Sequence, residues 1–411
     1  MIINIIEGGV TAAKGFKAAG YAAGIKKNTD KMDMAMIMSS VPCICAGTFT
    51  TNVVKAAPVI WDRERVMSGA PSQVVVVNSG IANACTGEEG MAYCQRTAEA
   101  VAQKLIVSPE SVLIGSTGVI GAQLPIDRIE EGISHLADML DGSMESGTKA
   151  AQAIMTTDTV EKQNAVTFTL SDGTVATLGG CCKGSGMIHP NMCTMLSFLT
   201  TDVSISKELL QEALSEDIRD TYNMISVDGD TSTNDTVLLL ANGLAGNKMI
   251  CERDADYQLF REVLHEVNLY LAKQIASDGE GATALFSCHV QHASCKEDAR
   301  KLARSVVSST LTKAAIAGHD ANWGRILCAL GYSGAVFEPE MIDIMIESRA
   351  GKLKIVEKGK AADYSEEEAT RILSENDITI TADMNAGAAE ATAWGCDLTH
   401  EYVDINADYR S

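Results

Sequence analysis

The spacing of hydrophobic residues predicts a first half in which strands and helices alternate. Apolar runs and two-residue alternation mark the strands, and the turn sequence Ser-Asp-Gly joins two of them in a hairpin. The predicted strands are residues 73–78, 111–114, 165–170 and 174–178. Apolar positions three and four apart predict helices over residues 88–105 and 126–140, the second preceded by Pro125 at its start.

The second half continues the mixture and becomes richer in strands toward its end. The predicted helices are residues 206–224, 255–276, 296–317 and 365–374. The predicted strands are residues 236–240, 282–290, 341–346, 352–356 and 377–382. Neither internal repeats nor a Pro/Ser-rich linker divides the chain, so the pattern predicts an α/β protein without a compositional boundary.

Charge and composition narrow the class of partner. The 411 residues include 33 Lys and Arg against 54 Asp and Glu, a formal net charge of −21. Nucleic acids and anionic membranes require clustered positive charge, so neither is expected, and a small-molecule partner is favoured. The amino terminus lacks the order of regions of a secretory signal, and no apolar run approaches the ~20 residues that span a bilayer. We therefore expect a cytoplasmic protein.

Twelve cysteines are spread through the chain, and we expect reduced thiols. The arrangements nearest to a metal motif are Cys43 with Cys45, the adjacent Cys181 and Cys182, and the group Cys288, His289, His292 and Cys295, which offers four possible ligands. Residues 282–292 alternate like a strand, which places neighbouring candidate ligands on opposite faces. No metal site is therefore expected.

A glycine-rich segment, residues 179–194, lies between the predicted hairpin and the next apolar run. Gly184 and Gly186 follow Lys183 closely and allow backbone to approach a ligand, and His-Pro-Asn at residues 189–191 forces a turn before Thr194. Taken alone, this pattern indicates a glycine-rich loop that enters a strand.

The run KGSGMIHPNMCTMLSFLTTD at residues 183–202 resembles the signature of the glutamate N-acetyltransferase (ornithine acetyltransferase) family. Further matches follow in order along the chain. They are GGVTAAKGFKAAG (8–20), AGTFTTN (46–52), NSGIANACTG (78–87), GSTGVIG (115–121), MTTDT (155–159), SVDGDTSTNDT (226–236), SDGEGAT (277–283), NWGRI (322–326) and YVDINADYRS (402–411).

The resemblance implies an α/β fold in which β-sheets pack face to face with helices outside, as in the superfamily of DmpA and ornithine acetyltransferase, which has an Ntn-hydrolase-like architecture. Family members cut themselves before the threonine, so cleavage is expected between Cys193 and Thr194. The products are an α chain (residues 1–193) and a β chain (residues 194–411). The resemblance also implies a dimer of these αβ pairs.

The implied activity is acetyl transfer in arginine biosynthesis. Cleavage would free the α-amine of Thr194, which can act as a base for the hydroxyl of the same residue. In the implied ping-pong cycle Thr194 takes acetyl from N-acetylornithine, ornithine leaves, and glutamate's amine takes the acetyl group. No cofactor is implied, and acetyl-CoA as a second donor is left open.

The resemblance also assigns residues to the site. Thr117 and Gly118 form the oxyanion hole, which stabilises negative charge on the acetyl oxygen. The implied substrate contacts are Thr157, Lys183, Thr194, Glu280, Asn406 and Ser411, with Thr156 as an alternative to its neighbour Thr157. Lys183 suits a substrate carboxylate, Glu280 an ammonium, and the others hydrogen bonds to the amino-acid backbone.

Two residues before the cut depart from the family, which usually has alanine at His189 and Cys193. We interpret His189 as a hydrogen-bonded loop histidine, because the threonine amine already supplies a base. Ala321 also replaces the family's proline, and the strand after Thr283 is atypical. Two other functions stay open: a self-cleaving amidohydrolase or aminopeptidase with the same nucleophile, and an uncleaved binding protein without catalysis.

Overall fold

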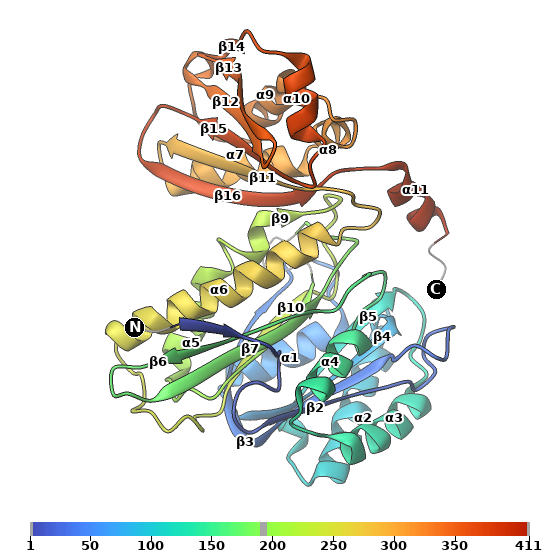
Figure 1. The fold of residues 1–411 in the computed structure, drawn as a ribbon. Coiled ribbons are helices and arrows are strands. Elements are labelled where there is room, and N and C mark those ends of the chain that lie inside the picture. The colour runs from blue at the N-terminus through green and yellow to red at the C-terminus, as the bar shows by residue number, and fades with distance from the viewer. Residues whose placement is uncertain (1–2, 190–194, 409–411) are drawn as a thin grey trace.

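The structure is a computed structural model that describes residues 3–189 and 195–408, and a mixed sheet is its central feature (Figure 1). Nine strands of the described residues join it in the order β1-β6-β7-β8-β10-β3-β4-β5, with β2 pairing β3 beside this path. Their bounds are β1 (Ile3–Ile6), β2 (Phe16–Tyr21), β3 (Met34–Phe49), β4 (Ser72–Ile81), β5 (Val112–Val119), β6 (Lys162–Thr169), β7 (Val175–Lys183), β8 (Leu196–Thr201) and β10 (Thr236–Ala241).

The sheet folds back on itself at β3. One end of this 16-residue strand pairs with β2 and β4, and the other end pairs with β10. Side chains from the two halves meet in one buried cluster, in which Val77 and Leu113 come from one half and Phe198 and Leu238 from the other. The two halves therefore pack face to face, as predicted.

Helices cover the outer faces of both halves. On one side lie α5 (Lys207–Asp217) and α6 (Ala255–Ser277); on the other lie α1 (Ala57–Ser68), α2 (Gly87–Leu105) and α3 (Ile126–Met139). A further helix, α4 (Met144–Ala153), packs against β2 and β3. No helix of the described residues combines the length and apolarity that a membrane-spanning segment requires.

Two predicted helices were too long. The helix predicted over residues 206–224 ends at Asp217, because the chain turns inward so that Ile218 and Tyr222 fill the core; the Tyr222 hydroxyl lies 3.0 Å from Ser197 Oγ. The helix predicted over residues 296–317 is two helices, since the Ser309 side chain accepts from Thr312 N–H and starts a new one. The hairpin between β6 and β7 is confirmed.

The C-terminal part of the chain forms a second sheet, which the sequence pattern did not separate from the first. Its seven strands in the described residues run in the order β14-β13-β12-β15-β11-β16-β9. Their bounds are β9 (Ile225–Ser226), β11 (Leu285–Ala293), β12 (Asp343–Ser348), β13 (Gly351–Glu357), β14 (Lys360–Ala361), β15 (Asp377–Asp383) and β16 (Ala389–Cys396). The accompanying helices are α7 (Lys296–Ser308), α8 (Thr310–Ala317), α9 (Trp323–Gly331) and α10 (Glu366–Leu373).

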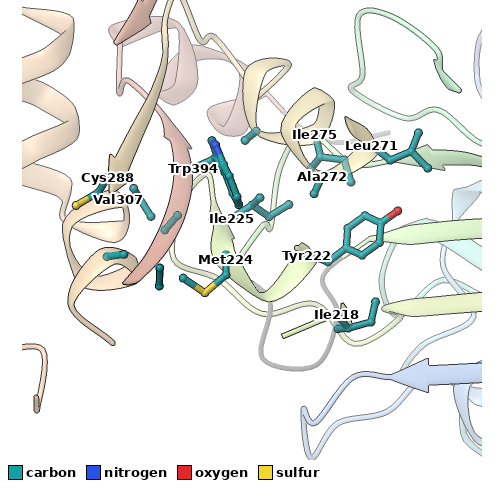
Figure 2. Close-up of a cluster of buried hydrophobic side chains, with 14 of the residues drawn as sticks. Ile218, Tyr222, Met224, Ile225, Leu271, Ala272, Ile275, Cys288, Val307 and Trp394 are labelled. Atoms are coloured by element: carbon teal, nitrogen blue, oxygen red, sulfur yellow. The ribbon is translucent and has the colours of Figure 1, made fainter. Parts of the chain in front are cut away.

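The second sheet joins the first unit through a continuous apolar contact. Figure 2 shows Ala272 and Ile275 of α6 beside Ile225 of β9, which pairs with Trp394 of β16. All four side chains belong to one buried cluster that includes Tyr222. This packing fixes the C-terminal end of α6, which leads directly into the glycine-rich loop that carries Glu280.

Candidate active site

A cavity of about 130 Å³ opens where β5 and β7 end and β8 begins, beside the loops that precede β10 and β11. Segments far apart in the sequence line it. The lining includes Thr117, Gly118, Thr156, Thr157, Lys183, Gly184, Gly186, Met187, Ile188, Met195, Leu196, Ser232, Asn234, Asp235, Glu280 and Asn406. The structure therefore gathers at one cavity every predicted site residue that it describes: Thr117, Gly118, Thr157, Lys183, Glu280 and Asn406.

Three predicted site residues, Cys193, Thr194 and Ser411, lie outside the described residues. The position of Thr194 in the chain still relates it to the cavity. Met195 and Leu196, the next two residues, both line the cavity.

Thr117 and Gly118 lie at the end of β5, which is an edge strand of the sheet. Gly118 has φ +131°, and a Cβ there would lie 2.3 Å from the backbone of Gly80. Glycine is therefore required at position 118, where β5 lies against β4. The carbonyl of Ser116, the residue before Thr117, accepts a 2.7 Å hydrogen bond from Asn234 Nδ2.

Lys183 ends β7 and places its amine inside the cavity. The side chain is buried, and its Nζ donates to Thr156 Oγ1 at 2.8 Å and to Thr117 Oγ1 at 3.4 Å. Burial lowers the pKa of Lys183, and the negative charge of Asp158 opposes that shift. The Lys183 amine thus hydrogen-bonds both to Thr117 of the predicted oxyanion hole and to Thr156, the alternative to the predicted substrate contact Thr157.

A buried network of ion pairs lies next to Lys183 and supports its position. Lys162 Nζ lies 2.7 Å from Asp158 Oδ1 and 2.6 Å from Asp278 Oδ2, and both ends of the first pair are fully buried. Asp158 also accepts from the N–H groups of Gly184 and Thr156. Burial alone would raise the pKa of Asp158, but the positive charges of Lys183 and Lys162 outweigh it and hold that pKa below its usual range.

Glu280 closes the opposite side of the cavity. Its N–H donates to the Ser185 carbonyl at 3.0 Å, and its Oε2 accepts from Asn406 Nδ2 at 2.7 Å. Gly186 passes so near that a Cβ there would lie 2.4 Å from the Glu280 carboxylate. Asn406 comes from α11 (His400–Ala407), the C-terminal helix that stands beside the rest of the fold in Figure 1. Tyr402 of α11 donates to Asp228 Oδ2 at 3.3 Å and so anchors the helix.

Sequence reasoning missed the functional content of one motif. SVDGDTSTNDT served as evidence for the family, yet the structure brings Ser232, Asn234 and Asp235 from it into the cavity wall. Asp235 is 2% exposed, and burial raises its pKa well above the usual range. The run of small polar residues just before the buried strand β10 could have indicated these residues, because buried polar side chains seldom lack a hydrogen-bond partner.

The other sequence candidates lie away from the cavity. The ring of His189 has its Nδ1 3.1 Å from Ser226 Oγ, in agreement with a hydrogen-bonded loop histidine. Burial and the charge of Arg304 lower its pKa to about 4. In β11, Cys288 points into the core while His289 faces the other side, as the alternation predicted, and His292 pairs with Asp383 at 2.9 Å.

Comparison with known proteins places this chain in a known family. The model of the ArgJ family matches residues 17–411. The arginine biosynthesis bifunctional protein ArgJ of Symbiobacterium thermophilum is 52% identical over 407 residues, which are 99% of each chain. The protein of the same name from Thermotoga neapolitana is 50% identical over 400 residues, which are 97% of this chain and 99% of that protein.

A solved structure agrees with the sequence relatives. The crystal structure of arginine biosynthesis bifunctional protein ArgJ from Bacillus halodurans is 46% identical and matches with a TM-score of 0.50. The match covers 52% of this chain and 99% of that chain. The chain therefore belongs to the ArgJ family, the bifunctional acetyltransferases of arginine biosynthesis.

Proposed function

We propose that the protein cuts itself between Cys193 and Thr194 and then carries acetyl on Thr194 Oγ from N-acetylornithine to glutamate. One observation carries the proposal. The cavity beside Met195 collects an oxyanion-hole pair, Thr117 and Gly118, together with one buried cation, Lys183, and one carboxylate, Glu280. These groups match the two charges and the developing oxyanion of an N-acetyl amino-acid substrate.

The sheet supports the association of the two fragments after the cut. β8 and β10, from the β chain, lie between β7 and β3, from the α chain. The Bacillus halodurans chain supports the cut itself, because it is matched over 99% of its length and yet corresponds to 52% of 411 residues, about 214 residues. The proposed β chain has 218 residues, a similar length.

The proposed chemistry uses the nucleophile's own amine. The α-amine of Thr194 takes the proton of its hydroxyl as Oγ attacks the acetyl carbonyl. Thr117 Oγ1–H and Gly118 N–H stabilise the oxyanion, a contribution of ~3 kcal/mol for a single donor. Collapse breaks the bond between the acetyl carbon and nitrogen, and the ammonium returns its proton to the departing ornithine amine. Glutamate's amine then attacks the acetyl ester by the same steps.

The charges of the cavity orient N-acetylornithine. Lys183 takes the α-carboxylate, and Glu280, which Asn406 already holds, takes the side-chain ammonium of ornithine. Thr157 and Ser411 complete the contacts to the substrate backbone. Acetyl-CoA is proposed as a second donor to the same threonine, because the relatives are named bifunctional. We also propose a dimer of αβ pairs.

Deacetylation of N-acetylornithine with and without glutamate tests transfer against hydrolysis. Transfer predicts ornithine release that requires glutamate beyond one turnover, with an equal amount of N-acetylglutamate formed. Turnover independent of glutamate would assign the site to a self-cleaving amidohydrolase instead. Thr194→Ala is expected to be uncleaved and inactive, and normal exchange by that variant would refute the nucleophile.

A further inference from the structure

Lys26 does not line the cavity, but its position in the loop between β2 and β3 is firmly set. The buried carboxylate of Asp33 accepts hydrogen bonds from the Ile25 N–H at 2.6 Å and from the Lys26 N–H at 3.0 Å. At the other end of the side chain, Lys26 Nζ donates to the Met32 carbonyl at 2.8 Å. Both the backbone and the amine of Lys26 are therefore held within one short loop.

The same amine reaches the loop that carries Thr156. Lys26 Nζ donates to the Met155 carbonyl at 2.8 Å, and burial lowers the pKa of Lys26 to about 8, so the amine is mostly an ammonium at pH 7. The Met155 carbonyl and the Thr156 N–H belong to one peptide group, and this N–H donates to Asp158 Oδ2 at 3.0 Å. Charged side chains thus hold both polar atoms of the peptide group that leads into Thr156.

The methylene stem of Lys26 lies behind the predicted oxyanion hole. A Cβ at Gly80 would lie 3.0 Å from Lys26 Cγ, and Gly80 pairs with Gly118 between β4 and β5. One side chain therefore supports two walls of the cavity from outside: that of Gly118 with its stem and that of Thr156 with its amine.

Thr156 connects this support to the buried cation of the cavity. Among the described residues, the Lys183 amine donates to two hydroxyls, that of Thr156 at 2.8 Å and that of Thr117 at 3.4 Å. The shorter bond is the stronger one, so the direction of the Lys183 amine depends mainly on the position of the Thr156 hydroxyl. That position follows from the peptide group that Lys26 and Asp158 hold.

We propose that Lys26 is a positioning residue for substrate binding: it holds the Met155 carbonyl, and through Thr156 it aims the Lys183 amine at the α-carboxylate of the substrate. The inference rests on the proposed function, in which Lys183 takes that carboxylate. If Lys26 served only to stabilise its own loop, its loss would lower stability and leave the substrate preference unchanged.

The preference for N-acetylornithine over its α-amide measures whether Lys183 is aimed correctly. Lys26→Met removes the donors and keeps a stem beside Gly80. We expect it to raise KM for N-acetylornithine ~10-fold, with kcat within about twofold and KM for the α-amide nearly unchanged. Lys26→Arg keeps a cationic donor and should recover most of the difference. Lys31→Met changes an exposed lysine of the same loop and, as the matched control, should behave like wild type.

A double-mutant cycle with Thr156→Val tests whether Lys26 acts through Thr156. Valine has nearly the shape of threonine and lacks the hydroxyl that accepts from Lys183. Thr156→Val alone should raise KM for N-acetylornithine ~10-fold, and the addition of Lys26→Met should raise it no further. Losses that multiply in the double variant would overturn the proposal.

The substrate comparison gives the remaining outcomes. Lys26→Met with the wild-type preference would overturn the proposal, and so would an equal loss on both substrates, which indicates a merely structural role. If Lys26→Met does not fold, Lys26→Gln gives the same comparison, because its side chain is one atom shorter and uncharged. A wild type that transfers no acetyl, or that treats N-acetylornithine and its α-amide alike, would instead refute the proposed function.

Discussion

Lys183, the last residue of β7, pairs in the sheet with Leu196, the first residue of β8. The proposed cut lies between them in the sequence, so neighbouring strands hold both sides of it. The ladder extends from this pair to Leu178 and Thr201. Breaking one peptide bond therefore leaves the sheet and the cavity wall in place.

The two fragments should remain one particle after cleavage, because the β chain's β8 and β10 lie between strands of the α chain. We expect fragments of 193 and 218 residues to coelute in size-exclusion chromatography and to separate only in denaturant. Elution of either fragment alone under native conditions would contradict the interleaved sheet.

Thr117→Ala should lower kcat ~10²-fold with a smaller effect on KM, because the hydroxyl acts on charge that develops in the transition state. Steady-state kinetics of ornithine formation measures this. Thr117→Ser keeps the hydroxyl and serves as the matched control, which should retain most of the activity. Equal loss in both variants would assign Thr117 to packing rather than to the oxyanion.

Lys183→Met should raise KM for N-acetylornithine ~10- to 100-fold, the loss of a charge-assisted hydrogen bond worth ~1.5–3 kcal/mol. The α-amide of N-acetylornithine, which lacks the carboxylate charge, provides the control. The wild type should lose a similar factor on this amide, and the variant should barely distinguish the two substrates. A variant that still prefers the carboxylate would place that group elsewhere.

Asp158→Asn should destabilise the protein by ~3 kcal/mol at neutral pH, because it leaves Lys162 buried with one of its two carboxylates. Thermal or urea unfolding measures the change. The folded-state pKa of Asp158 is depressed, so its contribution is present above the unfolded value near ~4 and is lost as pH falls through the folded value. The variant should therefore lose less stability than wild type below pH ~4.

An exposed pair gives the control for this network. Glu145 and Lys149 form an ion pair on the surface of α4, and Glu145→Gln should leave the unfolding midpoint unchanged. An equal loss of stability in Asp158→Asn and Glu145→Gln would contradict the claim that burial makes the first ion pair important.

His189→Gln should leave the pH dependence of acetyl transfer unchanged between pH 6 and 9. The pKa of His189 is about 4, so the ring is neutral throughout this range and carries no titrating proton. The pH profile of kcat/KM checks this. If one limb of the pH profile disappeared in the variant, His189 would be identified as an acid or base of the cycle.

Motifs predicted most of the site, and periodicity predicted most of the elements near it. Thr117, Lys183, Glu280 and Asn406 belong to separate motifs, and the fold brings them to one cavity as the family resemblance implied. The place of Asp235 in the cavity wall could not be predicted, because its burial is a property of the folded surroundings and not of the local sequence.

Tertiary packing explains the errors in the fold. The helix at residues 206–224 shortened because Tyr222 is needed in the core, which helical periodicity cannot reveal. The 16-residue strand β3 escaped prediction because its two ends belong to different halves of the sheet and bury different faces. The separate C-terminal sheet has no polar linker before it, since it joins α6 through an apolar interface.

Denaturing mass spectrometry of the purified protein, before and after brief exposure to N-acetylornithine, tests the central claim most directly. We predict two fragments, beginning at Met1 and Thr194, with one acetyl group added to the second after exposure. A single unmodified chain of 411 residues would contradict both the self-cleavage and the acetyl-threonine intermediate.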